Sequence, residues 1–269
     1  IQSSADGTRI VFNSDAPDLV PNDTNGVSDI FLYDTLLDQL RRLNHGTEGK
    51  QSNGPSYSPR IDGLGQTVVF ISEADNLVSD DTNAVADVFL YLADYRSIER
   101  VSQDLEGYQT ITAAQHPALD EAGSIVLYDR ADVLGQREIC SYDTFTQRTE
   151  QLSLEQNLYG DLLDNHRPGI SVNGRYVVYL EQARDSQGNP FDCAVHVLDR
   201  NIQDFVRQIC PEELYGLTDP VPVFSPDGLW IEWRDTPIVL KVSSKVGAEA
   251  DMSSFRFPNP FTKNTTESP

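Results

Sequence analysis

Six acidic and amide residues stand at matching positions in two copies of one phrase. Residues 18–34 read DLVPNDTNGVSDIFLYD, and residues 76–92 read NLVSDDTNAVADVFLYL. The six residues are Asp23, Asn25, Asp29, Asp81, Asn83 and Asp87. Calcium-binding loops place oxygen ligands at alternate residues, with a glycine at the sharp turn and a later carboxylate that closes the shell. The spacing therefore makes each copy a candidate calcium site.

A second interpretation of the same residues stays open. Asp and Asn side chains also fix turns by bonding nearby backbone amides, without any ion. The first acid of a calcium loop is missing here, because Pro21 stands two residues before Asp23. Ala84 in the second copy replaces Gly26 of the first, and glycine adopts a tight left-handed turn more readily than alanine. If calcium binds, we expect the first loop to be the better site.

These phrases belong to a longer repeat that must position them. Turn glycines recur at intervals of about fifty to sixty residues, the length of a propeller blade; they are Gly7, Gly65, Gly123, Gly174 and Gly228. An aromatic residue stands five residues after each glycine; these are Phe12, Phe70, Tyr128, Tyr179 and Trp233. We expect the five aromatic residues to occupy equivalent buried positions between blades.

Each repeat has the composition of four short strands. An Asp-Gly or Asn-Gly pair makes a tight turn, and an alternating strand such as RYVVYLE follows it. A loop, a third strand such as DIFLYD and a final polar strand complete the unit. The sequence predicts an all-β fold, a propeller of four-stranded blades with five blades visible. We assign residues 1–244 to the propeller and residues 245–269 to a C-terminal tail.

The pattern S-x-DG-x-x-I-x-F, followed by DIFLYD and a terminal R-L, resembles the TolB-type β-propeller repeat. The phrase of residues 18–34 resembles a variant found in exported bacterial proteins. The resemblance covers about residues 1–244. It implies six blades in the usual case, so a sixth is expected if residues are missing upstream. It also implies binding to other proteins through one face or through the central channel.

Two histidines form a weaker candidate site. His116 and His166 both lie shortly before a proline, at the predicted start of an innermost strand. Such positions approach the channel of a propeller, where histidines bind metals or make structural hydrogen bonds. No nucleophile elbow, phosphate loop or zinc signature accompanies them. The sequence therefore names no catalytic residue and no cofactor other than calcium.

Charge and cysteines bear on partners and location. The chain has 42 acidic and 20 basic residues and a formal net charge of -22, which disfavours nucleic acid and anionic membranes. No apolar run is long enough to span a membrane.

Cys193 and Cys210 flank a predicted hairpin and can form a cross-strand disulfide, which would leave Cys140 unpaired. The alternative is three buried thiols. A disulfide would indicate export, whereas the opening IQSSADG contains no signal peptide, which fits a cytosolic protein or a removed leader.

The function predicted from these features is that of a non-enzymatic, exported bacterial propeller, periplasmic or extracellular. It would serve as a protein-interaction or structural module, as a subunit of a surface or filament assembly. The alternative is a hydrolase or lyase whose site lies in the central channel. Several carboxylates or histidines that converge at one channel mouth would favour the enzyme.

Overall fold

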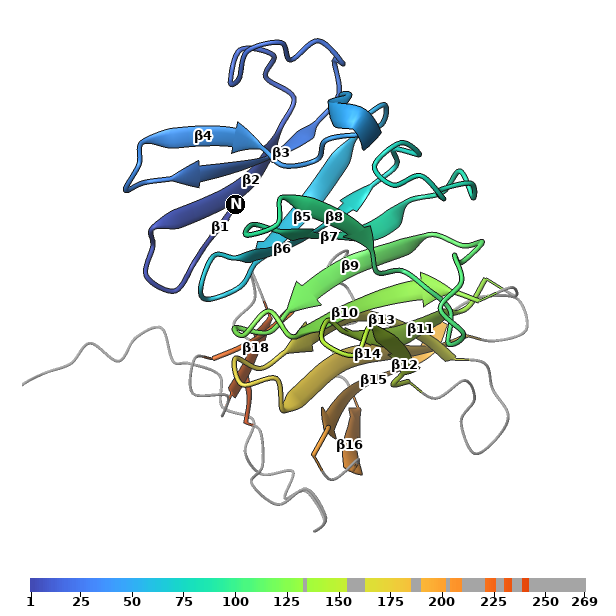
Figure 1. Cartoon of the computed structure of the whole chain (residues 1–269). Helices are drawn as coiled ribbons and strands as arrows, with labels where there is room; N and C mark the ends of the chain where they lie inside the picture. The colour runs from blue at the N-terminus through green and yellow to red at the C-terminus, as the bar shows by residue number, and fades with distance from the viewer. Residues whose placement is uncertain are drawn as a thin grey trace, which may run out of the picture.

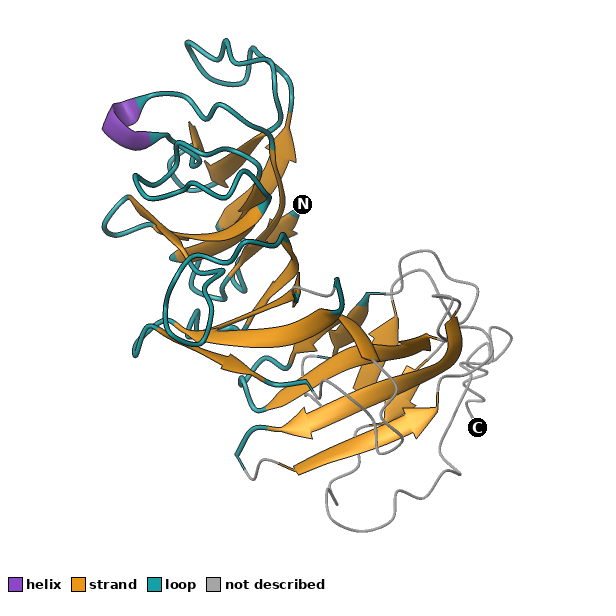
Figure 2. Ribbon diagram, turned by 90° about the vertical axis from the view of Figure 1, so that its right-hand side faces the viewer, coloured by secondary structure: helices purple, strands orange, loops and turns teal. Residues whose placement is uncertain are grey.

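The structure is a computed structural model. It describes residues 1–132, 135–153, 163–184, 190–201, 204–209, 221–225, 230–233 and 239–241. Nearly all described elements are strands, which confirms the all-β prediction. The helical turn η1 (Thr47–Gly49) lies outside the sheets, among loops (Figure 2). No helix of the described segments is long and apolar enough to cross a membrane.

Five antiparallel sheets follow one another along the chain, and each corresponds to one sequence repeat. We call them blades 1 to 5. Blade 1 consists of β1 (Gln2–Ser3), β2 (Arg9–Ser14), β3 (Asp29–Asp34) and β4 (Gln39–Arg42). Blade 2 consists of β5 (Ser56–Ile61), β6 (Thr67–Ser72), β7 (Asp87–Leu92) and β8 (Ser97–Arg100). Blade 3 consists of β9 (Ala114–Leu119), β10 (Ile125–Ala131), β11 (Arg137–Asp143) and β12 (Arg148–Gln151).

Blade 4 consists of β13 (Leu163–Ile170), β14 (Tyr176–Arg184), β15 (Pro190–Asp199) and β16 (Asp204–Ile209). The described strands of blade 5 are β17 (Pro222–Phe224), β18 (Trp230–Trp233) and β19 (Val239–Lys241). The blades succeed one another from the blue β1–β4 to the orange β18 (Figure 1). The first strands of successive blades pack against each other, which makes them the innermost strands. The predicted tail, residues 245–269, lies outside the described residues.

The turn between the first and second strands depends on its glycine. Gly7, Gly65, Gly123 and Gly174 all have a φ of about 70°, in the left-handed region that costs a side chain about 1–2 kcal/mol. This shared requirement explains why glycine marks the repeat so regularly. Gly228 of the fifth repeat lies outside the described residues.

Apolar clusters join each blade to the next. Val11, Ile30 and Leu32 of blade 1 pack against Phe70 and Phe89 of blade 2. Similar clusters join blades 2 and 3, blades 3 and 4, and blades 4 and 5. The predicted aromatic residues each occupy the fourth position of β2, β6, β10, β14 or β18. Their equivalence is confirmed.

The predicted burial is correct for four of these aromatic residues and wrong for Phe12. Phe70, Tyr128, Tyr179 and Trp233 are buried, whereas Phe12 is half-buried. The four buried rings face the preceding blade, and within the described residues no apolar cluster joins blade 5 to blade 1. Phe12 stacks on Phe31 of its own blade instead, with 5.7 Å between ring centroids.

The three cysteines differ in state. Cys193 is disulfide-bonded, and Cys140 is free and buried, as predicted for both. Ala194 pairs with Ile209 in β15 and β16, which is the register that a Cys193–Cys210 bond requires; Cys210 itself lies outside the described residues. Burial raises the pKa of the Cys140 thiol to about 12. That thiol is therefore protonated at neutral pH and is no nucleophile.

Candidate functional site

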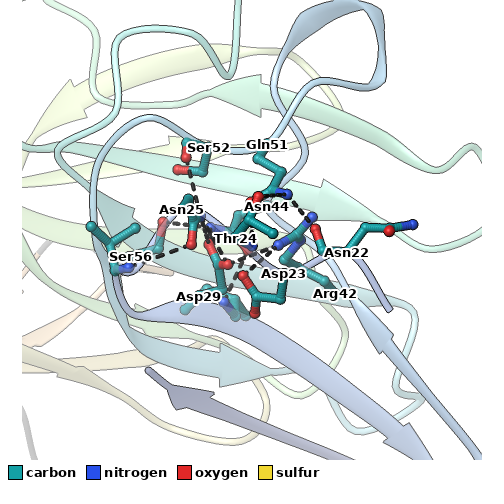
Figure 3. Close-up of polar contacts among 12 residues, drawn as sticks. Asn22, Asp23, Thr24, Asn25, Asp29, Arg42, Asn44, Gln51, Ser52 and Ser56 are labelled. Atoms are coloured by element: carbon teal, nitrogen blue, oxygen red, sulfur yellow. Dashed lines mark hydrogen bonds and ion pairs between the residues drawn. The ribbon is translucent and has the colours of Figure 1, made fainter. Parts of the chain in front are cut away.

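The acidic phrase of blade 1 forms a network centred on Asp29, the first residue of β3 (Figure 3). The Asp29 carboxylate has no solvent exposure. It accepts hydrogen bonds from Asn44 Nδ2 at 2.6 Å, Asn25 Nδ2 at 3.1 Å and Arg42 Nη1 at 3.1 Å. Every donor in this set is a side chain, so the prediction that Asp29 bonds backbone amides is wrong. Its partners lie in β4 and in the loops before β3 and after β4. A local turn pattern in the sequence does not predict contacts between these segments.

Arg42 joins the two acids of the phrase. Its Nη1 lies 3.1 Å from Asp23 Oδ1 and 3.1 Å from Asp29 Oδ2. The Arg42 and Asp23 side chains are only 9% and 6% exposed, so solvent screens this pair weakly. The guanidinium thus occupies the position between the carboxylates that a cation would take.

The same network fixes blade 1 to blade 2. Asn44 Nδ2 also bonds Ser56 Oγ at 2.9 Å, and Ser56 is the first residue of β5. The Ser56 backbone N–H donates to the Ser28 carbonyl at 2.7 Å. Asn25 Nδ2 bonds the Ser52 carbonyl, again at 3.1 Å. The residues of the phrase therefore form a polar clamp between consecutive blades, in addition to the apolar cluster that joins them.

Gln51, in the segment that leads into blade 2, holds the tip of the loop. Its Oε1 accepts from the Thr24 backbone N–H at 3.1 Å, and its Nε2 donates to Thr24 Oγ1 at 3.1 Å and to the Asn22 carbonyl (Figure 3). One glutamine thus satisfies backbone groups at both sides of the turn. The loop tip is fixed by the next repeat rather than by its own residues.

Blade 2 repeats most of this arrangement. Asn83 Nδ2 bonds Asp87 Oδ2 at 2.8 Å and the Thr110 carbonyl at 2.8 Å. Ser102, at the position of Asn44, donates its hydroxyl to Asp87 Oδ1 at 2.6 Å. Gln109 Nε2 donates to Asp81 Oδ1 at 2.8 Å. The phrase occurs twice because the junction between blades 1 and 2 and the junction between blades 2 and 3 use the same clamp.

The two clamps differ in their arginine. Arg100, at the position of Arg42, bonds the exposed Asp80 at 3.0 Å and lies 4.0 Å from Asp81. Asp87 is fully buried and has no ion pair of its own in the described residues. Burial raises the pKa of Asp87 and also that of Asp81. The negative charges of the blade 2 carboxylates are thus less well balanced by an arginine than those of blade 1.

The backbone of the two loops is alike despite the Gly26-to-Ala84 difference. Gly26 has a φ of 70° and Ala84 a φ of 56°, so alanine adopts the turn that we expected it to resist. Asn25 Oδ1 and Asn83 Oδ1 accept from the N–H two residues on, Val27 and Val85, at 3.4 and 3.2 Å. These side-chain bonds hold the turn in both copies, and they offset the strain at Ala84.

Calcium binding at Asp23, Asn25, Asp29, Asp81, Asn83 and Asp87 stays a prediction. Among the residues described, no three carboxylate, imidazole or thiol groups are arranged to hold a metal ion. In blade 1 an ion would have to displace Arg42 from both carboxylates. Blade 2 is the better candidate on this ground, which reverses the order that Gly26 suggested.

A chelator experiment decides the calcium prediction. If an ion is bound, addition of a calcium chelator lowers the melting temperature, and a crystal structure shows oxygen ligands at about 2.3–2.6 Å. Asp87→Ala should abolish that response for the blade 2 loop. If the clamps need no ion, the chelator leaves the melting temperature unchanged, and added calcium has no effect either.

A second polar cluster lies between blades 3 and 4, and only part of it was visible in the sequence. His116 Nδ1 lies 2.7 Å from Asp129 Oδ2, and Asp129 is fully buried. Arg137 Nε donates to Asp129 Oδ1 at 2.6 Å. His166 Nδ1 lies 3.2 Å from the backbone carbonyl of Asp164. The two histidines make hydrogen bonds as one of our alternatives expected; Asp129 and Arg137 were missed.

The repeat pattern alone does not single out Asp129. It stands six residues after the turn glycine, where blade 2 has Ile71 and blade 4 has Leu180, but the first repeat has Asn13 and the fifth has Arg234 at this position. Other acids near strand ends do not join this cluster: Asp120 caps its own turn through the Ser124 and Ile125 N–H groups.

Comparison with known proteins identifies the fold. No family model and no curated protein sequence matches the chain. TolB from Acinetobacter baumannii is similar over 89% of this chain and 50% of its own, with 18% identity and a TM-score of 0.54. A putative TolB from Agrobacterium tumefaciens is similar over 76% of this chain and 62% of its own, with 15% identity and a TM-score of 0.51.

A xyloglucanase from Xanthomonas campestris is similar over 85% of this chain and 34% of its own, with 10% identity and a TM-score of 0.51. The chain therefore spans between half and two thirds of the two TolB proteins. At these identities the similarity establishes a TolB-like β-propeller fold. The fold alone does not carry an activity, because propellers serve many functions.

Proposed function

We propose that this TolB-like β-propeller is an exported, non-enzymatic protein-interaction module of a larger bacterial assembly. The observation that carries the proposal is a set of apolar side chains at the hairpins between third and fourth strands. Leu36 is 78% exposed in blade 1, Tyr95 is 80% exposed in blade 2, and Phe145 is 94% exposed in blade 3. These hairpins share one end of the propeller because the blades share one topology.

Single exposed apolar residues are ordinary, but recurrence at one structural position is not. Leu37, beside Leu36, is also exposed, and aromatic residues are enriched where proteins meet. The hairpin tips together present a row of exposed apolar side chains along one rim. A protein partner that lies along this rim would bury them, and its surface should be neutral or basic there, given the net charge of -22.

Export is supported by the state of the cysteines. Cys193 is disulfide-bonded, and disulfides persist mainly in oxidising compartments. The periplasm and the cell exterior provide such conditions, and the two TolB neighbours come from bacteria. We therefore propose a periplasmic or extracellular location.

Site-specific photocrosslinking tests the interaction proposal. A photoreactive residue at position 95 or 145 should give discrete adducts with a protein in the producing cell. A photoreactive residue in place of Glu48, which is exposed in η1 at the other end of the blade, is the control. The double variant Tyr95→Ser/Phe145→Ser should weaken recovery of that partner at least about ten-fold. Equal crosslinking from Glu48, or none from the tips, would contradict the proposal.

A second candidate function is a hydrolase or lyase with a site in the central channel. The His116–Asp129 pair favours it, because a buried carboxylate that orients an imidazole is a recurring arrangement in general-base catalysis. The test is a panel of glycoside, ester and peptide substrates. Turnover that His116→Gln abolishes without loss of folding would favour the enzyme, whereas the absence of turnover on the panel leaves the interaction module as the better account.

A further inference from the structure

The loop between β8 and β9, residues 103–112, exposes three large apolar side chains. Leu105 is 55% exposed, Tyr108 is 71% exposed and Ile111 is 73% exposed. We call these three residues the apolar triad. The loop leaves β8 at the end of the blade opposite to the hairpin between β7 and β8, which is the end that carries the acidic phrases. The apolar triad is therefore separate from the rim of hairpin tips.

The corresponding loop of blade 1 is polar at all three positions. Residues 43–53 (LNHGTEGKQSN) and 101–111 (VSQDLEGYQTI) align without a gap, and one antiparallel bridge closes each loop. The apolar triad aligns with Thr47, Lys50 and Asn53. Lys50 Nζ pairs there with Glu48 Oε2 at 3.0 Å. A loop of this length and bridging thus forms without the apolar residues, and grouped apolar side chains that a fold does not need are typical of contact surfaces.

Hydrogen bonds fix the 103–112 loop at its tip and at its side. Asp104 Oδ1 accepts from the Glu106 N–H at 3.0 Å and from the Tyr108 N–H at 2.8 Å. Gln109 Nε2 donates to Asp81 Oδ1 at 2.8 Å, which joins the loop to the blade 2 phrase. A surface that is ordered before binding loses less conformational entropy when a partner docks. The loop therefore presents the apolar triad in a preorganised form.

The charged groups beside the apolar triad are acidic. The 103–112 loop contains Asp104 and Glu106, and neither this loop nor the blade 2 phrase, residues 76–92, contains a lysine or an arginine. The Asp80 side chain of that phrase is 74% exposed, whereas that of its partner Arg100 is only 6% exposed. A partner surface of the same sign would be repelled. A second copy of this chain, with a net charge of -22, is for this reason a poor occupant.

We propose that the apolar triad docks a partner polypeptide whose apolar side chains are flanked by lysine or arginine. The apolar groups of the partner bury the triad, and its cations pair with the carboxylates of Asp80 and Glu106 at the edge. Because the hairpin rim lies at the other end of the blades, a propeller with both surfaces joins two partners. The inference does not rest on the rim, and each surface has a test that leaves the other untouched.

Selection from a phage-displayed library of random peptides tests the chemistry of the partner. The target is the intact chain, and the counter-target is the triple variant Leu105→Thr/Tyr108→Ser/Ile111→Asn. This variant keeps the net charge and should fold normally, because polar residues occupy these positions in blade 1. Peptides that bind the wild type but not the variant should be enriched in apolar residues together with Lys and Arg. They should be depleted in Asp and Glu relative to the unselected library.

Affinity measurements with one selected peptide separate the apolar contribution from the charge. The triple variant should raise the Kd at least about ten-fold, and Glu106→Lys should raise it at least about five-fold. Glu150→Lys, the same charge reversal at an exposed position of β12, should leave the Kd unchanged.

Four results would overturn the proposal. They are a selection that enriches no peptide, enriched peptides that are acidic or lack apolar residues, an unchanged Kd in the triple variant, and equal effects of Glu106→Lys and Glu150→Lys. Sedimentation of the free chain adds one more outcome. Concentration-dependent self-association that the triple variant abolishes would identify a second copy as the occupant, and it would also overturn the proposal.

Discussion

Asp29→Asn should lower the free energy of unfolding by about 3 kcal/mol, as expected when one partner of a buried ion pair is lost. All three side chains that contact Asp29 are donors: Asn25, Arg42 and Asn44. An amide at this position would turn its own N–H groups toward one of them. Arg42 would retain only Asp23, within a nearly closed site. Urea unfolding measures the difference.

Asp87→Asn is the matched control in blade 2, and we expect a change within about 1 kcal/mol. Among the described residues Asp87 has only Asn83 and Ser102 as side-chain donors, and the Ser102 hydroxyl can rotate to accept from an amide. Equal losses in the two variants would show that Arg42 adds nothing to the blade 1 clamp.

The pH dependence of this control has a defined sign. Burial raises the pKa of Asp87, so protonation of this carboxyl favours the folded state. Its contribution is full below the unfolded pKa of about 3.9 and is lost as the pH rises through the folded pKa. Relative to wild type, Asp87→Asn should therefore become more favourable as the pH rises from about 4 to neutrality. Chemical denaturation at a series of pH values measures the trend.

Asp129→Asn should also destabilise the protein by about 3 kcal/mol or more. The variant leaves Arg137 without its buried counter-charge, and the single acceptor oxygen of asparagine cannot serve the Arg137 and His116 sides of the group together. Burial by itself would raise the pKa of Asp129, but the His116 bond and the charges of His116 and Arg137 lower it overall. The stabilisation is therefore full above the unfolded pKa of about 3.9 and is lost as the pH falls below it.

Asp104→Asn is the control for this second prediction. Asp104 caps an exposed turn through the Glu106 and Tyr108 N–H groups, and asparagine can make the same bonds. Thermal or urea unfolding should show a change below about 0.5 kcal/mol. A comparable small change in Asp129→Asn would mean that the cluster between blades 3 and 4 contributes no net stability.

The fold was predictable because its rules act locally. A left-handed turn admits glycine with little strain, so Gly7, Gly65, Gly123 and Gly174 mark the blades in the sequence. The aromatic residue five positions later follows from strand alternation. Phe12 shows the limit of such reasoning, because its burial depends on a neighbouring blade rather than on its own repeat.

The site was less predictable, because its contacts join residues that are distant along the chain. The acids at 23 and 29 suggested an ion, but the partners are Arg42 and Asn44, in and after another strand of the blade. Arg42 and Arg100 stand at equivalent positions of their repeats, so the sequence spacing does not distinguish them. Arg42 nevertheless bonds both acids, whereas Arg100 bonds Asp80. Side-chain direction in the folded blade decides between these pairings.

Native-state hydrogen exchange on Asp29→Asn tests the central claim, that the acidic phrase clamps one blade to the next. The amides to follow are those of the loop before β3 and that of Ser56, which bonds the Ser28 carbonyl across the junction. If the clamp joins the blades, the loop amides and the Ser56 amide lose protection against exchange together, while the amides of β9 and β10 in blade 3 stay protected. Loss confined to the loop, with Ser56 as protected as in wild type, would contradict it.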